Sequence, residues 1–329
     1  MFTRREFLIA SAVAMALGRP GLAKAASSAG TLGFKLFDAH CHLRTDDLVK
    51  YPRAPKVQGA GGPPGSDDPH ANHDTPSVEA VLAWMDANDV AGAATVQHRL
   101  SYGFDNRYIL DSADAHRNRL VPVCVLDAED PGTPARIDAY VRDHGLAGIR
   151  LTGPQAGDGA FPWLSSRQAL ATWAAANKHG LCIDVMTVPP GRNPAAIAEF
   201  SHLARQFPNV RLVLNHIGWL ANEGAPDFGL SAEQVALKAQ KNIYYKFSTI
   251  NIDLLREAKL SPADTLRHVV DVYDAGHVLW GSDIGNSVGP YSRLVDAIVA
   301  ASVKLTSAEK RAVLHDTGKH VYARGGWRA

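Results

Sequence analysis

Two histidines close to the N-terminus could act together on a substrate or a metal ion. His40 and His42 end the segment FDAHCH at residues 37–42, which follows an apolar start typical of a buried strand. Residues two apart on a β-strand point to the same side, so both imidazoles should face one way. Two convergent imidazoles are half of a metal site or a pair that can polarise a carbonyl group.

Two later apolar runs also end in one ionisable side chain just before a glycine. VRLVLNHIG delivers His216 ahead of Gly218, and HVLWGSDIG delivers Asp283 ahead of Gly285. Each glycine allows the chain to turn away at once and leaves the side chain at the strand end. Ionisable groups next to buried strands are stable only in a polar cluster. The predicted cluster consists of His40, His42, His216 and Asp283.

The elements that must position these side chains alternate regularly along the chain. Continuous apolar runs, typical of parallel strands buried on both faces, cover residues 35–40, 91–97, 120–126, 148–151, 181–186, 210–216, 242–248 and 277–283. Amphipathic stretches at 77–88, 106–119, 167–180 and 195–207 are predicted helices, and 306–315 is a predicted closing helix. This alternation predicts one (β/α)₈ TIM barrel over residues 26–329. A doubly wound open sheet is the rival, but no G-x-G-x-x-G turn follows the first strand.

A long loop at residues 43–76 follows the first predicted strand and is rich in proline and glycine. Loops of this length inside a compact domain are usually functional or disordered. Because it leaves the C-terminal end of a barrel strand, we expect it to lie over the mouth where barrel enzymes carry their active sites.

Five motifs in order along the chain resemble the amidohydrolase-related family. They are FDAHCHL, GIRL, LNHIG, YYKFS and WGSDIG, and Tyr51 and residues 97–110 add to the likeness. This branch of the amidohydrolase superfamily contains TIM-barrel metal-dependent hydrolases and lactonases. The resemblance implies that His40, His42 and Asp283 are metal ligands and that Asp283 and His216 are catalytic.

The resemblance also implies contacts with the substrate. Arg150 matches a fourth-strand arginine that often meets an anionic group, and Lys246 on the seventh predicted strand could do similar work. Gln97 and His98, at the end of the second predicted strand, are further candidates. The alternatives are a structural ion pair for Arg150 and a rim position for Lys246 with its ammonium in water.

The fifth predicted strand, LCIDVM, departs from the family because it lacks a histidine. A two-metal site is therefore not expected. A single divalent ion, with Zn²⁺ the expected choice, could be held by His40, His42 and Asp283. Metal-free lactonases of the same branch use the same residues as hydrogen-bond donors and base, so both possibilities stay open.

The expected function is the opening of a lactone of a sugar acid or small carboxylic acid by base-activated water. A metal-dependent decarboxylase or hydratase on the same barrel is the alternative, followed by a non-catalytic periplasmic binding protein. The expected partner is a small anionic molecule. A net charge of +1 over 329 residues gives no general attraction to nucleic acid or to a membrane surface.

Residues 1–25 have the pattern of a twin-arginine export signal. Arg4 and Arg5 precede an apolar run, and Ala23 and Ala25 flank an A-x-A-like cleavage site. The run is too short for a permanent membrane span, which needs about 20 residues. We therefore expect a periplasmic mature protein. Three cysteines are too few for a disulfide framework.

Overall fold

The computed structural model describes residues 28–54, 75–188 and 191–322. The predicted export signal at residues 1–25 lies outside the described residues, and so does the middle of the loop after the first strand. Export and a periplasmic location therefore stay predictions. Within the described ranges, no helix has both the length and the apolar character needed to span a membrane.

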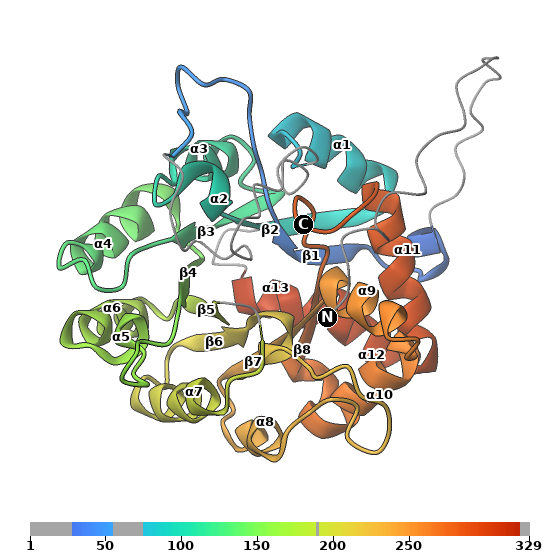
Figure 1. Cartoon of the computed structure of the whole chain (residues 1–329). Helices are drawn as coiled ribbons and strands as arrows, with labels where there is room; N and C mark the ends of the chain where they lie inside the picture. The colour runs from blue at the N-terminus through green and yellow to red at the C-terminus, as the bar shows by residue number, and fades with distance from the viewer. Residues whose placement is uncertain (1–27, 55–74, 189–190, 323–329) are drawn as a thin grey trace, which may run out of the picture.

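Eight parallel strands form a single sheet in sequential order, which confirms the predicted (β/α)₈ barrel (Figure 1). The strands are β1 (Leu36–Cys41), β2 (Val90–Val96), β3 (Leu120–Val125), β4 (Gly148–Gly153), β5 (Cys182–Thr187), β6 (Arg211–Leu214), β7 (Ile243–Ser248) and β8 (Val278–Gly281). Each strand pairs with the next in parallel register.

The first and last strands meet just beyond the end of β8 and close the barrel. The backbone N–H of Asp283 donates to the carbonyl oxygen of His40 at 2.8 Å, and that of His42 donates to Ile284 at 3.2 Å. Three of the predicted site residues thus take part in the backbone hydrogen bonds that close the barrel. The closure fixes the distance between the two ends of the chain that carry the site.

Helices surround the strands in the order expected of a βα repeat (Figure 1). The longer ones are α1 (Val78–Ala87), α3 (Arg107–Ala115), α4 (Thr133–His144), α6 (Arg167–His179), α7 (Pro194–Gln206), α9 (Thr249–Glu257), α10 (Pro262–Tyr273) and α11 (Tyr291–Ala301). The short ones are α2 (Arg99–Tyr102), α5 (Pro162–Ser165), α8 (Ala232–Ala236), α12 (Ser307–Arg311) and α13 (Thr317–Tyr322). Local sequence sets their starts, as where the Ser77 side chain accepts from the Ala80 N–H and caps α1.

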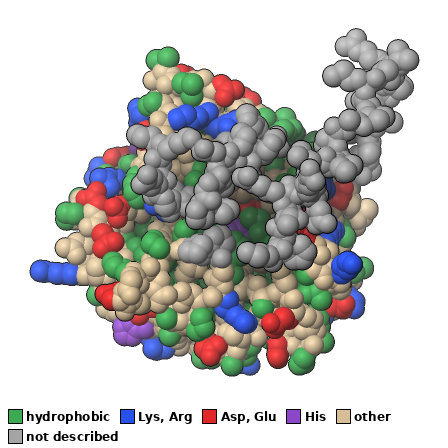
Figure 2. All heavy atoms as spheres, viewed as in Figure 1, with side chains coloured by type: hydrophobic (Ala, Val, Ile, Leu, Met, Phe, Trp, Pro, Cys, Tyr) green, Lys and Arg blue, Asp and Glu red, His purple; other side chains and the backbone are tan. Residues whose placement is uncertain are grey.

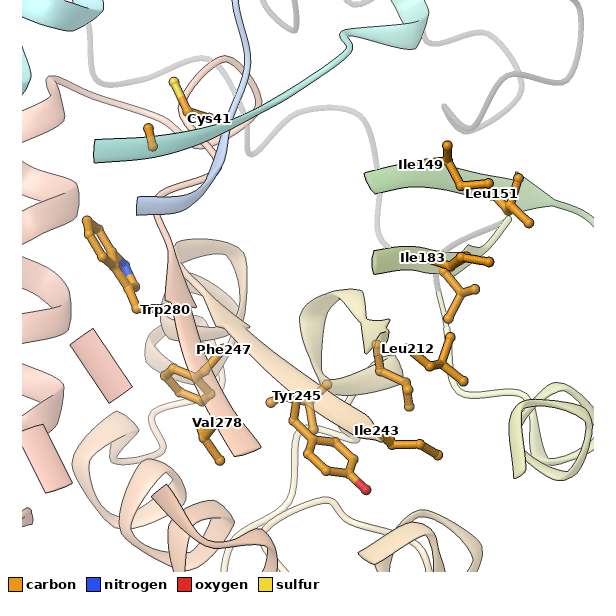
Figure 3. Packing of buried hydrophobic residues seen from close by; sticks show 14 of the residues in the cluster. Cys41, Ile149, Leu151, Ile183, Leu212, Ile243, Tyr245, Phe247, Val278 and Trp280 are labelled. Carbon is orange, nitrogen blue, oxygen red and sulfur yellow. The ribbon is translucent and has the colours of Figure 1, made fainter. Parts of the chain in front are cut away.

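Alternate residues of each strand belong to two different hydrophobic clusters. Ile149, Ile183, Tyr245 and Phe247 point outward and belong to the large cluster beneath the helices (Figure 3). A smaller buried cluster, formed by inward side chains of the strands, includes Tyr322 of α13. This second cluster closes the lower end of the barrel, so the interior is packed and the site can form only at the opposite end.

Two predicted strands end earlier in the structure than in the sequence pattern. The pattern extends through residues 216 and 283, whereas β6 ends at Leu214 and β8 at Gly281. The reason is a left-handed backbone at both sites, with φ of 55° at His216 and 54° at Asp283. The predicted closing helix is also interrupted, because α12 passes into a π-helical turn at Ala312–Asp316.

Gly281 of β8 leaves room for the side chain of His40. A Cβ atom at this position would lie 2.5 Å from the Cβ of His40, closer than real Cβ contacts. We predict that Gly281→Ala lowers the free energy of unfolding by about 1–3 kcal/mol, measured by chemical denaturation, because the strands must shift. Gly157→Ala is the control, since a Cβ there meets no atom within 4 Å. Equal stability of both variants would contradict this account of the closure.

Candidate active site and metal centre

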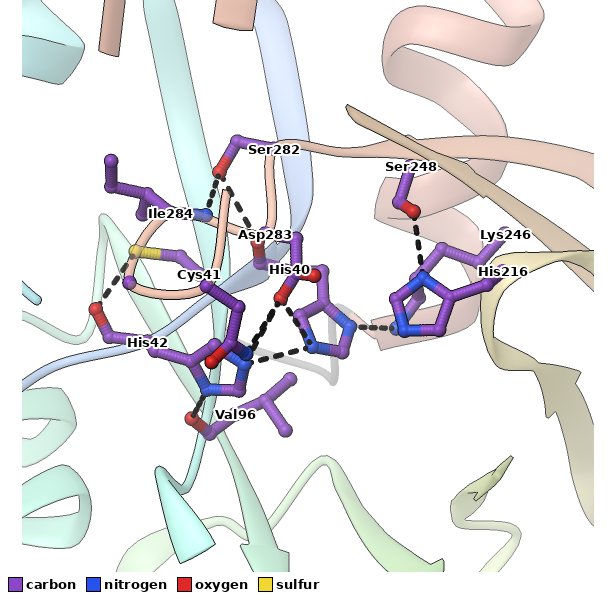
Figure 4. A network of polar contacts seen from close by, with 12 residues as sticks. His40, Cys41, His42, Val96, His216, Lys246, Ser248, Ser282, Asp283 and Ile284 are labelled. Atoms are coloured by element: carbon purple, nitrogen blue, oxygen red, sulfur yellow. Dashed lines mark hydrogen bonds and ion pairs between the residues drawn. The ribbon is translucent and has the colours of Figure 1, made fainter. Parts of the chain in front are cut away.

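Three side chains from opposite ends of the chain meet at the mouth of the barrel (Figure 4). Oδ1 of Asp283 lies 3.1 Å from Nε2 of His42 and 3.5 Å from Nε2 of His40. The two Nε2 atoms are 3.2 Å apart. All three side chains are buried. We call His40, His42 and Asp283 the three-ligand cluster.

A bulge in β1 and a hydrogen bond to β2 orient the two histidines. Asp38 pairs with Ala93 and Cys41 with Thr95, so β1 has one residue more than β2 in this interval. Such a bulge changes the direction in which side chains point. Nδ1 of His42 lies 2.8 Å from the carbonyl oxygen of Val96, which can only accept. The proton of a neutral His42 therefore sits on Nδ1, and its Nε2 is free to accept or to bind a metal.

Asp283 is held in a strained turn that aims its carboxylate at the histidines. Its φ of 54° is uncommon for a non-glycine residue, although Asp and Asn tolerate it better than most. Its carbonyl oxygen accepts from the N–H groups of Asn286 and Ser287. The Asn286 amide also donates to Oδ1 at 3.2 Å, whereas the buried Oδ2 has no partner among the described residues. One carboxylate oxygen is thus left for a water or a substrate.

His216 approaches the cluster from the turn that follows β6. Its ring centroid is 5.9 Å from that of His40, and its Nδ1 bonds to Oγ of Ser248 at 2.7 Å. The turn Asn215–Gly218 contains consecutive left-handed residues, with φ of 55° at His216 and 59° at Ile217. Strain of this kind persists only where surrounding contacts enforce it, and it concentrates at functional sites. The structure therefore brings the four predicted residues together.

Burial keeps the imidazoles of His40, His98 and His216 neutral, whereas nearby groups keep Asp283 ionised in spite of its burial. Burial lowers the pKa of His216 to about 4, although Asp283 opposes the shift, and it lowers the pKa of His98 to about 3. Burial, followed by the nearby Lys246 ammonium, also lowers the pKa of His40. Burial alone would raise the pKa of Asp283, but nearby groups, the Arg150 guanidinium among them, bring it below the usual value. A charged base thus faces the neutral imidazoles of His40 and His216 at neutral pH.

A cavity of about 80 Å³ opens beside His42, and two arginines are among the residues that line it. Its lining residues are His42, His98, Arg99, Leu100, Val125, Arg150, Thr152, Met186, Val188 and Asn286. A histidine side chain is visible in the hollow at the centre of this face (Figure 2). Arg150 is 6% exposed, donates to the sulfur of Met186 at 3.1 Å and has a buried Nε without a partner in the described chain.

The predicted substrate contacts occupy different depths. Arg150 and His98 line the cavity, and Nε2 of His98 lies 3.4 Å from Oδ1 of Asn286. Gln97 is buried behind them, with its amide nitrogen bonded to the carbonyl oxygen of Asp105. Lys246 is neither at the rim nor among the cavity residues, because it is fully enclosed and paired with Asp184. The rim alternative is therefore wrong, and a substrate contact of Lys246 stays a prediction.

Asp38 is a structural residue of the site that the sequence pattern did not single out. Its Oδ1 accepts from the N–H groups of His40 and Ser282, and its Oδ2 accepts from the hydroxyl of Tyr291. It therefore ties β1 to the end of β8 and to α11. Arg99 was also missed, because nothing in its sequence context distinguishes it from a surface arginine.

The three-ligand cluster has the spacing required to hold one divalent ion. Tetrahedral ligands at about 2.0–2.1 Å from Zn²⁺ lie about 3.3 Å from one another, close to the separations of 3.1–3.5 Å found here. Metal-binding histidines usually donate their other ring N–H to a carbonyl or carboxylate, as His42 does to Val96. The cluster could therefore hold a metal ion.

We predict that the protein binds one Zn²⁺ per chain when the metal is titrated, measured by calorimetry. His42→Asn and Asp283→Asn each remove a ligand and should weaken binding by more than the ~10–100-fold typical of losing an outer hydrogen-bond partner. His98→Asn is the control, because His98 lies beside His42 but outside the cluster. Equal weakening by the control would place the metal elsewhere.

Comparison with solved structures supports the barrel. A protein described as a 2-pyrone-4,6-dicarboxylic acid hydrolase of Pseudomonas putida is 20% identical, with a TM-score of 0.64, covering 88% of this chain and 97% of its own. A Burkholderia multivorans amidohydrolase with bound zinc is 19% identical, with a TM-score of 0.65, covering 88% and 100%. A Rhizobium 2,6-dihydroxybenzoate decarboxylase is 14% identical, with a TM-score of 0.61, covering 88% and 98%.

At these identities the likeness establishes the fold and leaves the reaction open, since the neighbours include both hydrolases and decarboxylases. No curated protein matches the sequence. The family model described as amidohydrolase matches residues 37–324, which include all eight strands except the first residue of β1, and all four residues of the predicted cluster. The chain belongs to the amidohydrolase family.

Proposed function

We propose that this enzyme hydrolyses a lactone that carries a carboxylate group. The observation that carries the proposal is the free carboxylate oxygen of Asp283, which lies beside neutral imidazoles at the edge of a cavity with an unpaired guanidinium. A base, hydrogen-bonding groups for a carbonyl oxygen and an anion receptor are the parts that opening of an anionic cyclic ester requires.

Arg150 favours an anionic substrate. Its guanidinium is buried, its only hydrogen-bond acceptor among the described residues is a thioether, and no carboxylate there forms an ion pair with it. Burying an arginine without a carboxylate partner is unfavourable, so the site is stabilised when an anion enters. A substrate carboxylate that forms a bidentate pair with the Arg150 guanidinium would also orient the ring of the lactone.

Asp283 is the proposed general base. Oδ2 takes a proton from a water molecule, and the water oxygen forms a bond to the carbonyl carbon of the lactone. The C–O bond of the ring then breaks, and the proton held by Asp283 passes to the departing alcohol oxygen. The products are a hydroxyl group and a new carboxylate, so atoms and charge balance once the acid releases its proton.

The imidazoles around Asp283 supply the stabilisation of the developing negative charge. Removal of one such hydrogen-bond donor in other acyl-transfer enzymes costs about 10²–10³ in rate. Because His40 and His216 are buried, their positions are fixed before the reaction starts and water does not compete with them. A divalent ion held by the three-ligand cluster would supply Lewis-acid polarisation of the same carbonyl oxygen.

Decarboxylation of a small carboxylic acid is the second candidate. The three-ligand cluster favours it, because solved neighbours of this fold include a dihydroxybenzoic acid decarboxylase with bound manganese. The products separate the two reactions. Lactone opening releases acid and no carbon dioxide, whereas decarboxylation releases carbon dioxide.

We predict that Asp283→Asn lowers kcat for opening of a carboxylated lactone by at least about 10²-fold. Asparagine tolerates the left-handed backbone at this position, so the variant should keep the fold. Acid release from a panel of aldonolactones and pyrone lactones, with and without chelator, is the measurement. Asp158→Asn is the matched control, because Asp158 is exposed and far along the chain from the cluster. Full activity of Asp283→Asn would overturn the assignment of the base.

We predict that Arg150→Met raises KM for a carboxylated lactone by about 10–100-fold, the effect of losing a hydrogen bond to a charged group. The KM for a neutral lactone of similar size should stay within a few-fold of its wild-type value. Steady-state kinetics with the paired substrates provides the test. A similar loss for both lactones would mean that Arg150 supports the cavity rather than binding an anion.

A further inference from the structure

Lys246 is held inside the barrel directly behind His40. Its side chain is 0% exposed, and its Nζ lies 2.5 Å from Oδ2 of Asp184 and 3.0 Å from Nδ1 of His40. Asp184 is itself fixed, because the hydroxyl of Tyr322 donates to its Oδ1 at 2.6 Å and the thiol of Cys182 lies 3.2 Å from the same oxygen. The amine therefore has one position, between a carboxylate and an imidazole, and Figure 4 shows Lys246 beside His40.

The pair of Lys246 and Asp184 makes the amine a hydrogen-bond donor toward His40. One proton lies on the short axis between Nζ and Oδ2, whichever of the two atoms holds it. As long as the pair keeps this proton, as an ammonium with a carboxylate or as an amine with a carboxylic acid, the two other substituents that Nζ can direct at His40 are N–H groups. Nδ1 of His40 must then accept, and the proton of the neutral imidazole sits on Nε2.

The two histidines of the cluster thus have opposite outer partners. Nδ1 of His42 faces the carbonyl oxygen of Val96, an acceptor, which leaves Nε2 of His42 without a proton. Nδ1 of His40 faces a donor, which places an N–H at Nε2, 3.2 Å from Nε2 of His42 and 3.5 Å from Oδ1 of Asp283. The hydrogen bonds run in one direction from Lys246 through His40 to His42.

We propose that Lys246 is a positioning residue that makes His40 a hydrogen-bond donor to the substrate site. The same contact lowers the affinity of His40 for a metal ion. A ligand histidine needs an unprotonated coordinating nitrogen and usually has an acceptor at its other nitrogen. Here a bound ion would require His40 to move its proton to Nδ1, against the Lys246 N–H. The inference holds for either candidate reaction, because it rests only on the contacts behind His40.

The test is the affinity for Zn²⁺ of the double variant Lys246→Met/Asp184→Asn. Removing both partners avoids an unpaired buried charge, and methionine retains the length of the lysine stem. His40 is then free to place its proton on Nδ1. We expect the variant to bind Zn²⁺ about 10–100-fold more tightly than the wild type in a competition titration against a chelator. Unchanged or weaker binding by the folded variant would overturn the proposal.

Tyr322→Phe is the matched control, because it removes a hydrogen bond to Asp184 but leaves the Lys246–His40 contact. Its Zn²⁺ affinity should equal that of the wild type, and an increase as large as that of the double variant would also count against the proposal. A second measurement is made on the wild-type protein, and a variant serves only to assign its signals. The metal-free wild-type protein is labelled with ¹⁵N at its histidines, and the His40 signals are assigned by their loss in His40→Asn. The ¹⁵N NMR spectrum should show that Nδ1 of His40 is unprotonated and that its Nε2 carries the proton. The reverse assignment would contradict the proposal.

Discussion

The closure of the barrel between β1 and the end of β8 is the contact on which the site depends. One backbone hydrogen bond joins His40 to Asp283, and the carboxylate of Asp38 binds the backbone on both sides of the seam. These residues are more than 240 positions apart in sequence. The reacting groups therefore meet only when the last strand has joined the first, so the fold and the site form together.

The barrel interior between the smaller buried cluster and the active site is polar, and its polar side chains contact one another in a fixed order. Tyr322 from the closing helix holds Asp184, Asp184 holds Lys246, and Lys246 contacts His40. A buried ion pair is weak evidence for stability, since an apolar pair of similar volume is often as stable. What the pair contributes is instead the direction that it imposes on the imidazole of His40. The C-terminal helix thereby reaches the substrate site through three side chains.

Sequence patterns predicted the barrel, the eight strands and the convergence of the four site residues, because buried strands and strand-end side chains leave periodic signals. They failed where tertiary contacts decide. The early ends of β6 and β8 follow from left-handed residues, which periodicity does not detect. Lys246 was expected at the rim or on the substrate, and Asp184 had no predicted partner. Only the structure, in which both side chains point into the barrel interior from β5 and β7, shows that Lys246 and Asp184 form one ion pair.

The account rests on attack of water at the carbonyl carbon of an anionic lactone. Hydrolysis in water enriched with ¹⁸O, followed by mass spectrometry of the product, tests this step most directly. One labelled oxygen should appear in the new carboxylate and none in the hydroxyl group. A label on the hydroxyl oxygen, or release of carbon dioxide with no turnover of any lactone, would contradict it.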